Sequence, residues 1–315
     1  MGRRRARSPL PPRDGLDAVW VRTPARVGSA PNPWPTLPAF LRDRLPAVVP
    51  VDAWVAAGRF ATAAGTPVAS DTPYTPATLV WFHKDPTEEQ PPAPLAVLHA
   101  GERLVVVDKP HFLATIPRGA FVRRSALVQA RVQLGLPELA PAHRLDRLTA
   151  GVLVFTTEPR WRAAYQTLFA DRAVRKTYEA LAPSLDLAGP LEIRNHLVKR
   201  RASRQVEVVP GAAPNAETRI TLLERRDALA RYRLEPATGR THQLRVHLAG
   251  LGAPIVDDPL YPDDRLTDDA PEDPARPLRL LAQRIDFTDP VDGTHRTFTS
   301  RHELAWPDQS TAPGL

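Results

Sequence analysis

Hydrophobic residues recur along the chain with two different periods, which predict helices in some stretches and strands in others. In LPAFLRDRLP, the apolar residues Leu37, Phe40, Leu41 and Leu45 have helical spacing. The stretches VDAWVAAGRF, SALVQARVQLGL and PRWRAAYQTLFADRAV have comparable patterns and predict further helices. By contrast, the short apolar runs in RLVVVDKP and VLVFTT are typical of buried strands. Strands are also expected in RKTYEALAP and on both sides of a turn at Asp227.

The order of these elements predicts the fold class and a division of the chain. Strands joined by helices and by hairpins favour an α+β fold with a mixed, largely antiparallel sheet. We expect this sheet in a large domain at 95–305. A small α/β accessory unit with a helix–helix–hairpin pattern is expected at 36–84, after an Arg/Pro-rich irregular arm at 1–35. The charged, proline-rich stretch 85–94 is typical of a linker.

Composition adds a prediction about the partner. The chain carries a formal charge of +7, which favours a polyanion such as nucleic acid. The same charge is also compatible with a protein that is basic only for solubility. The chain has no cysteine, which excludes disulfides, thiolate metal sites and a cysteine nucleophile.

The sequence predicts neither a membrane span nor a secretory signal. It lacks a run of about 18 apolar residues. The basic start, MGRRRARSPLPPRDG, is not followed by the apolar segment of a signal peptide. This start is typical of a solvated tail, or of an arm that touches phosphate. We therefore expect a cytoplasmic protein with no membrane partner.

The segment HRLDRLTAG, residues 143–151, is the first candidate for chemistry. It places Asp146 between Arg144 and Arg147, directly before the strand expected in VLVFTT. An ordinary surface ion pair is one explanation of this pattern. Alternatively, a loop held by the sheet fixes the orientation of the carboxylate, and the neighbouring guanidinium groups favour its ionised form. Such a carboxylate can act as a nucleophile or as a base.

The segment GRTHQLRVHLAGLG is the second candidate. Leu244, Leu248 and Leu251 repeat with helical spacing and Gly252 is a plausible stop, so a helix is expected from near Thr241. An amphipathic helix with a solvated Arg/His face is the simplest interpretation.

The histidines of this segment do not predict a metal site. His242 and His247 are five residues apart, whereas two ligands on one helical face are three or four apart, and no carboxylate has suitable spacing. A metal-dependent RNA hydrolase would need a clustered set of carboxylates or histidines. The sequence offers no such set.

Two weaker signals complete a larger pattern. Lys109 and Pro110 close one strand, and Tyr178 lies in another, where a tyrosine usually belongs to the core. The motifs DKP, HRLDRLTAG, KTY, GRTHQLRVHLAGLG and APIVDDPLY follow one another in the order typical of the RluA-like pseudouridine synthases. The chain resembles this family over residues 95–290.

The resemblance implies an RNA pseudouridine synthase, an isomerase that needs neither a metal ion nor an organic cofactor. Such an enzyme breaks the bond between a uridine's nitrogen and its ribose, rotates the uracil and joins carbon 5 to the ribose. Asp146 would be the catalytic aspartate, which either attacks the anomeric carbon or assists a glycal-type pathway. The implied partner is ribosomal or transfer RNA, from which the target base has to be flipped.

The resemblance also assigns roles to neighbouring positions. Arg144 would occupy the space that the flipped base vacates, and Leu244 would pack against the base. Tyr178 would stack on the uracil and could exchange a proton at carbon 5. Arg245 would pair with Asp146 and keep it ionised and oriented. The remaining residues expected to bind substrate are His143, Arg240 and His242.

Four positions depart from the family pattern. Ala150 replaces the usual serine, Leu148 stands where an acid is common, Asp257 replaces a glycine, and Leu281 stands where histidine is frequent. None of them is a residue to which the chemistry is assigned. We therefore expect activity to be retained, while the loop at 255–262 and the choice of RNA can differ.

An alternative function is an RNA-binding protein or RNA chaperone without catalysis. The joint presence of Asp146, Tyr178 and Arg245 argues against it. The unit at 36–84 resembles a diverged small RNA-binding module, the one named after ribosomal protein S-four. It is poor in lysine and arginine, so a structural remnant is the other interpretation. We expect the protein to be a monomer.

Overall fold

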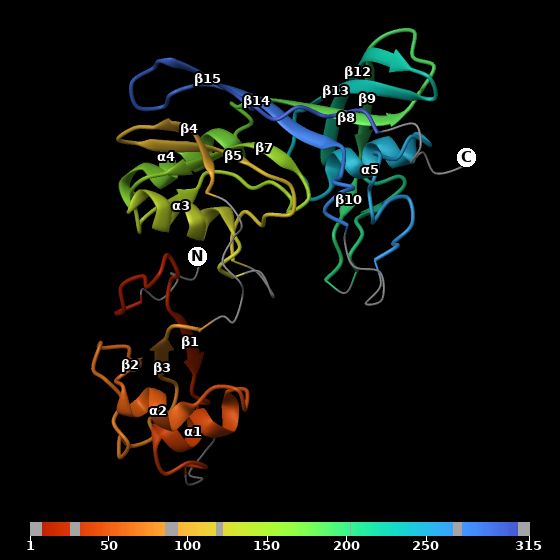
Figure 1. Ribbon diagram of the computed structural model, residues 1–315. Coiled ribbons are helices and arrows are strands. Elements are labelled where there is room, and N and C mark those ends of the chain that lie inside the picture. Colours follow the sequence, from red (N-terminus) through yellow and green to blue (C-terminus); the bar gives the residue numbers. More distant parts are fainter. Residues whose placement is uncertain are drawn as a thin grey trace. The chain divides into compact units, whose positions relative to one another are not determined.

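The protein is divided into two compact units, Met1–Glu89 and Gln90–Leu315. Its elements are shown in Figure 1, a computed structural model. Most of the linker expected at 85–94 lies outside the part of the chain that the structure describes. The described residues are 8–25, 32–85, 94–117, 122–201, 203–266 and 273–307.

The first unit combines two short helices with a three-stranded sheet. The strands are antiparallel in the order β1-β3-β2. The elements are α1 (Leu37–Arg44), α2 (Val51–Ala56), β1 (Val19–Arg22), β2 (Phe60–Thr62) and β3 (Leu79–Phe82).

Strand β1 lies inside the stretch 1–35, for which the sequence predicts an irregular arm. That prediction is wrong at residues 19–22. Val19 and Val21 pack against the core of the unit, while Trp20 and Arg22 point away and are exposed. This alternation is the mark of a half-buried strand, and it is too short to be recognised among the surrounding prolines and arginines.

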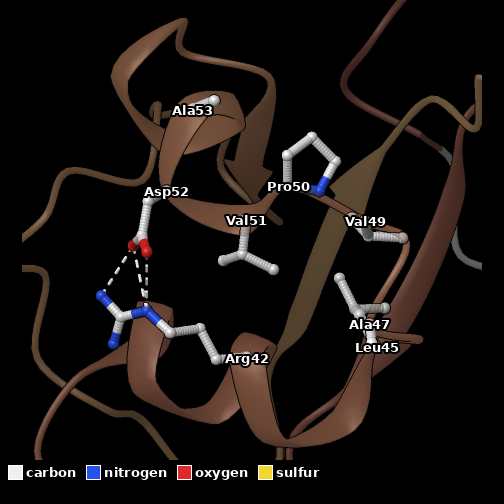
Figure 2. A pocket seen from close by; sticks show the side chains of 8 residues that line it. All are labelled: Arg42, Leu45, Ala47, Val49, Pro50, Val51, Asp52 and Ala53. Carbon is white, nitrogen blue, oxygen red and sulfur yellow. Dashed lines mark hydrogen bonds and ion pairs between the residues drawn. The ribbon is translucent and has the colours of Figure 1, made fainter.

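A pocket of about 390 Å³ lies beside the end of α1 and the start of α2. Figure 2 shows Arg42 and Asp52 facing each other at this pocket. The Nη2 atom of Arg42 donates to Oδ1 of Asp52 over 2.7 Å. The residues predicted to act on RNA are not among its lining residues, which are Arg42, Leu45, Ala47, Val49, Pro50, Val51, Asp52 and Ala53.

The second unit is built on a large sheet, in which ten strands of the described residues take part. The path through the sheet is β4-β5-β7-β14-β8-β13-β12-β9, with β15 beside β14 and β6 beside β7. The strands are β4 (Ala96–Ala100), β5 (Leu104–Lys109), β6 (Ala140–Pro141), β7 (Ala150–Thr156), β8 (Arg175–Pro183), β9 (Leu191–Asn195), β12 (Ala216–Arg226), β13 (Leu229–Pro236), β14 (Leu280–Thr288) and β15 (His295–Thr299).

The direction of the strands confirms the predicted fold class. Strand β7 pairs with β14 in parallel. The other pairings described in this sheet are antiparallel. The unit therefore has an α+β fold with a mixed, largely antiparallel sheet.

Two helices cover opposite faces of one half of this sheet. Helix α3 (Ala126–Leu134) packs with Val105 and Val107 of β5, whereas α4 (Pro159–Ala170) packs with Val106. Successive residues of a strand point to opposite faces. The continuous apolar run in RLVVVDKP therefore supplies both layers, which explains why it does not alternate with polar residues.

The other half of the sheet carries α5 (Gln243–Gly250), which Figure 1 shows beside β8, β9, β12 and β13. Leu244 and Leu248 belong to the same hydrophobic cluster as residues of β8, β12 and β13. Val246 belongs to a second cluster with Leu197 and Tyr261. The helix is therefore covered on both sides.

This cover makes the predicted solvated Arg/His face of the helix wrong. Arg245 and His247 are each only 2% exposed. The cover comes from the hairpin of β10 (Leu197–Val198) and β11 (Glu207–Val208) and from the segment around Tyr261. Contacts between segments so far apart in the chain leave no trace in helical periodicity.

Candidate active site

Asp146 lies in the loop that leads into β7. The loop residues on either side, Leu145 and Leu148, are buried, whereas the Asp146 side chain is 33% exposed. The backbone oxygen of Asp146 accepts a hydrogen bond from the N–H of Thr149 at 3.1 Å. The loop is thus anchored in the core on both sides of a carboxylate that faces solvent.

Side chains from the segment 109–115 hold the backbone of this loop. Three backbone oxygens next to Asp146 each accept a hydrogen bond from that segment. The bonds run from Thr115 Oγ1 to Leu145 O at 2.7 Å, from Lys109 Nζ to Arg147 O at 3.2 Å, and from His111 Nδ1 to Leu148 O at 2.6 Å. Such bonds fix the position of the carboxylate before any substrate arrives.

Lys109 supplies the buried amino group of this arrangement. Its side chain is 0% exposed, and Nζ also donates to the backbone oxygens of Pro110 and Leu113. Burial lowers the pKa of Lys109 to about 7, although the charge of Asp146 acts in the opposite direction. The weak Lys-Pro signal of the sequence thus corresponds to a residue that organises the Asp146 loop.

Gly151 allows β7 to approach β14 closely at the end of the loop. Its φ is +115°, and a Cβ atom there would lie 2.2 Å from the backbone oxygen of Ala282. Gly151 and Ala282 are partners in the parallel pairing of the two strands. The glycine is required because any side chain would push the strands apart.

Tyr178 lies opposite an irregularity in the sheet. Its neighbours Thr177 and Glu179 on β8 pair with Arg284 and Leu281 of β14, so two residues of β14 face Tyr178. Such a bulge changes the direction of nearby side chains. The ring packs against hydrophobic clusters on both halves of the sheet. Burial and the charge of Asp146 raise the pKa of the Tyr178 hydroxyl.

Arg245 does not form the predicted pair with Asp146. Its Nε and Nη2 atoms donate to the two carboxylate oxygens of Asp258, at 2.7 and 2.6 Å. Asp258 is 0% exposed, and its Oδ1 also accepts from the N–H groups of Leu260 and Tyr261. Burial alone would lower the pKa of Arg245, but Asp258 and, more weakly, Asp146 raise it. Both of these hydrogen bonds from Arg245 go to Asp258. Asp146 therefore affects Arg245 only through its charge.

The side chain that approaches Asp146 is His242. Its Nε2 atom lies 4.0 Å from Oδ2 of Asp146, and its Nδ1 atom lies 3.0 Å from the hydroxyl of Tyr261. Burial lowers the pKa of His242, while the charge of Asp146 opposes this effect. His242 has a φ of +53° and directly precedes α5, which begins at Gln243, two residues after the start predicted near Thr241.

The other predicted residues differ in their exposure and in their contacts within the protein. Arg144 is exposed, and no ion pair joins it to the described residues. Leu244 packs in the same cluster as Tyr178. Arg240 donates to the backbone oxygen of Asn215. His143 accepts from the N–H of Val154 and stacks on Phe169, so its contacts hold the start of the loop.

Three further residues of the site have no role assigned by the motifs. They are Asp258, Tyr261 and Gln243, whose side chain bonds to β12 and to the turn before α5. Asp258 and Tyr261 form the D-x-x-Y pattern in VDDPLY. The sequence does not show that Arg245 is the ion-pair partner of Asp258. Asp257, where the family pattern has a glycine, adopts a φ of +60°, a conformation that aspartate tolerates.

The described residues contain neither a metal-binding cluster nor a membrane-spanning helix. No group of three or more histidine, aspartate or glutamate side chains is placed to hold a metal ion. No helix there is long and apolar enough to cross a membrane.

Comparisons with known proteins identify the family of this chain. A sequence model of the family described as RNA pseudouridylate synthase matches residues 103–250. The dual-specificity RNA pseudouridine synthase RluA of Escherichia coli (strain K12) is 31% identical over 65% of this chain and 91% of its own length. Human pseudouridylate synthase RPUSD2 is 35% identical over 57% of this chain and 32% of its own length.

A third relative and two solved structures extend the likeness. An uncharacterized RNA pseudouridine synthase of Synechocystis is 31% identical, and the chain covers 64% of it, less than two thirds. Human RNA pseudouridylate synthase domain containing 4 has a TM-score of 0.51 at 26% identity, over 67% of this chain and 88% of that one. Human RNA pseudouridylate synthase domain containing 1 has a TM-score of 0.54 at 22% identity, over 68% of this chain and 86% of that one. This likeness shows a common fold.

The matches belong to one class of enzyme, the RNA pseudouridine synthases, which are isomerases. Within that class, the chain belongs to the RluA-like family.

Proposed function

We propose that this protein isomerises specific uridines of ribosomal or transfer RNA to pseudouridine, with Asp146 as the catalytic group. The observation that carries the proposal is the fixed loop, in which three side chains hold the backbone around a partly exposed carboxylate. Asp146 is also close enough to act electrostatically on Tyr178, Arg245 and His242. A carboxylate among such groups suits a reaction at a sugar carbon.

The described side chains support separate parts of the reaction. Arg144 is exposed and can enter the space left by a flipped base, while Leu244 and the ring of Tyr178 offer apolar surface to the uracil. The raised pKa of Tyr178 keeps a proton on its hydroxyl at neutral pH. That proton is available for exchange when the proton at carbon 5 leaves and nitrogen 1 gains one.

The chemistry at the ribose has two routes. Asp146 either attacks the anomeric carbon to form an ester or assists a glycal-type pathway. In both routes the bond to nitrogen 1 breaks and a bond to carbon 5 forms. His143, Arg240 and His242 are proposed to support substrate binding. Monomeric state and action in the cytoplasm stay predictions.

The test is Asp146→Asn, which keeps the size of the side chain but removes the carboxylate. We expect no detectable tritium release from RNA whose uridines are labelled at carbon 5. The variant should fold, because Arg245 keeps its partner Asp258. It should also bind RNA, because phosphate contacts come from arginines and lysines elsewhere.

A matched control is Asp186→Asn, since the Asp186 carboxylate is fully exposed and bonds only to Arg225 among the described residues. This variant should release tritium at the parent rate. Undiminished release by a folded Asp146→Asn protein would falsify the assignment. If the parent itself binds ribosomal and transfer RNA but releases no tritium from either, an RNA-binding function without catalysis is favoured.

A further inference from the structure

The segment around Tyr261 forms a second wall of the site. Tyr261 is 5% exposed and shares a hydrophobic cluster with Leu197, Val206 and Val246. Its ring lies under the guanidinium of Arg245, with 5.2 Å between Cζ and the ring centroid. The hydroxyl therefore points from a fixed ring, and its hydrogen bonds have a defined direction.

The hydroxyl of Tyr261 has two partners with different abilities. The backbone N–H of Val206 can only donate, and its nitrogen lies 2.7 Å from the hydroxyl oxygen. The oxygen therefore accepts that bond, and the hydroxyl's own proton can be donated to Nδ1 of His242, 3.0 Å away. Burial raises the pKa of Tyr261 to about 12, so this proton is present at neutral pH.

A hydrogen bond donated by Tyr261 would decide which nitrogen of His242 carries a proton. A neutral imidazole that accepts at Nδ1 has its N–H at Nε2. Nε2 is the atom that faces Oδ2 of Asp146 at 4.0 Å. The opposite tautomer would direct a lone pair at the carboxylate, which is unfavourable.

We propose that Tyr261 is a positioning residue, which holds His242 as an Nε2–H donor to the carboxylate of Asp146. A separation of 4.0 Å is longer than a hydrogen bond, and catalytic bonds often shorten only when substrate is bound. The closed bond would fix the rotation of the carboxylate at the ribose. This inference rests on the proposed function of Asp146 and adds residues that act through it.

The first experiment measures the tautomer directly. In the full chain labelled with ¹⁵N-histidine, the signals of His242 are assigned by their loss in His242→Gln. At neutral pH we expect an unprotonated Nδ1 and a protonated Nε2 in the parent, and a mixture of both tautomers in Tyr261→Phe. A parent with the proton on Nδ1 would overturn the inference, whatever the activity.

The second experiment compares two tyrosines with similar surroundings. Tyr232 is also buried. Its hydroxyl accepts a hydrogen bond from the N–H of Leu185 at 2.7 Å and donates one to the backbone oxygen of Pro183. Tyr232→Phe thus removes the same number of bonds without touching His242. Tyr261→Phe should lower kcat for tritium release about tenfold, the effect of one hydrogen bond, and change KM less than about twofold. Tyr232→Phe should leave both nearly unchanged, while both variants lower the melting temperature.

A double variant separates positioning from a general loss of packing. His242→Gln can place an amide N–H near the position of Nε2, and an amide has no tautomers. In the His242→Gln background, Tyr261→Phe should therefore cause no further fall in kcat. An equal fall in both backgrounds, or a fall in Tyr232→Phe as large as in Tyr261→Phe, would mean that Tyr261 only supports the fold.

The proposed function and this inference fail in different ways. An active, folded Asp146→Asn protein contradicts the proposed function. If Asp146→Asn is inactive and Tyr261→Phe has the kcat of the parent, the positioning role alone is wrong.

Discussion

At the scale of single residues, the sequence and the structure differ most at Arg245. The motif predicts that Arg245 pairs with Asp146, whereas the structure bonds it to Asp258. An aspartate 13 positions further along the chain is not distinguished by spacing from its neighbours Asp257, Asp263 and Asp264. By contrast, Asp146 and Leu244 are recognisable from the sequence because each stands in a long motif, whereas Tyr178 is recognisable only from the order of the motifs around it.

The pair of Arg245 and Asp258 leads to a prediction about stability. Asp258→Asn should lower the free energy of unfolding by about 3–5 kcal/mol, because it leaves a buried guanidinium without a counter-charge. Denaturant melts of the parent and the variant measure this loss. Asp258→Asn combined with Arg245→Met should recover most of it, since no buried charge remains. A loss no larger than that of the exposed Asp186→Asn would contradict the prediction.

At the scale of elements, hydrophobic periodicity predicts those helices and strands whose burial is simple. The buried strands β5 and β7, the helices α3 and α4, and the turn between β12 and β13 are where the pattern puts them. Periodicity fails where distant segments supply the cover. Both sides of α5 are buried by parts of the chain that are not its neighbours in sequence, and β1 is held by its pairing with β3.

The strand pairing at Gly151 is the element on which the Asp146 loop rests. Gly151→Ala should lower the free energy of unfolding by at least about 3 kcal/mol, because the added Cβ meets backbone and the φ is unfavourable for alanine. Thermal melts and tritium release measure the effect. Gly189→Ala, where nothing lies within 4 Å of the added Cβ, should behave like the parent. Equal stability of the two variants would argue against the close strand contact.

At the scale of the whole molecule, the two units differ in what they contain. The hydrophobic cluster with Phe40 and Phe60 is built from residues of the first unit. The clusters around Asp146, Tyr178 and α5 are built from residues of the second. All residues proposed to act on uridine lie in the second unit, whereas the role of the first is a proposal drawn from its sequence pattern.

We predict that a chain beginning near residue 92 folds by itself, since its clusters do not use residues of the first unit. It should melt in one cooperative transition and keep part of its activity on a short RNA, with weaker binding to long RNA. Calorimetry, tritium release and binding isotherms test these points against the full chain. An insoluble or unfolded product would show that the division of the chain is wrong.

The parallel pairing of β7 and β14 also affects how the enzyme folds while it is being translated. Translation delivers the Asp146 loop and β7 long before β14, at about 5–20 residues per second. Until β14 has emerged, Ala150 and Gly151 lack their partners Leu281 and Ala282, and the loop is held only from the side of β5 and the segment 109–115. A gene fragment can therefore encode HRLDRLTAG and GRTHQLRVHL in full and still yield a nascent chain that cannot modify the RNA around it.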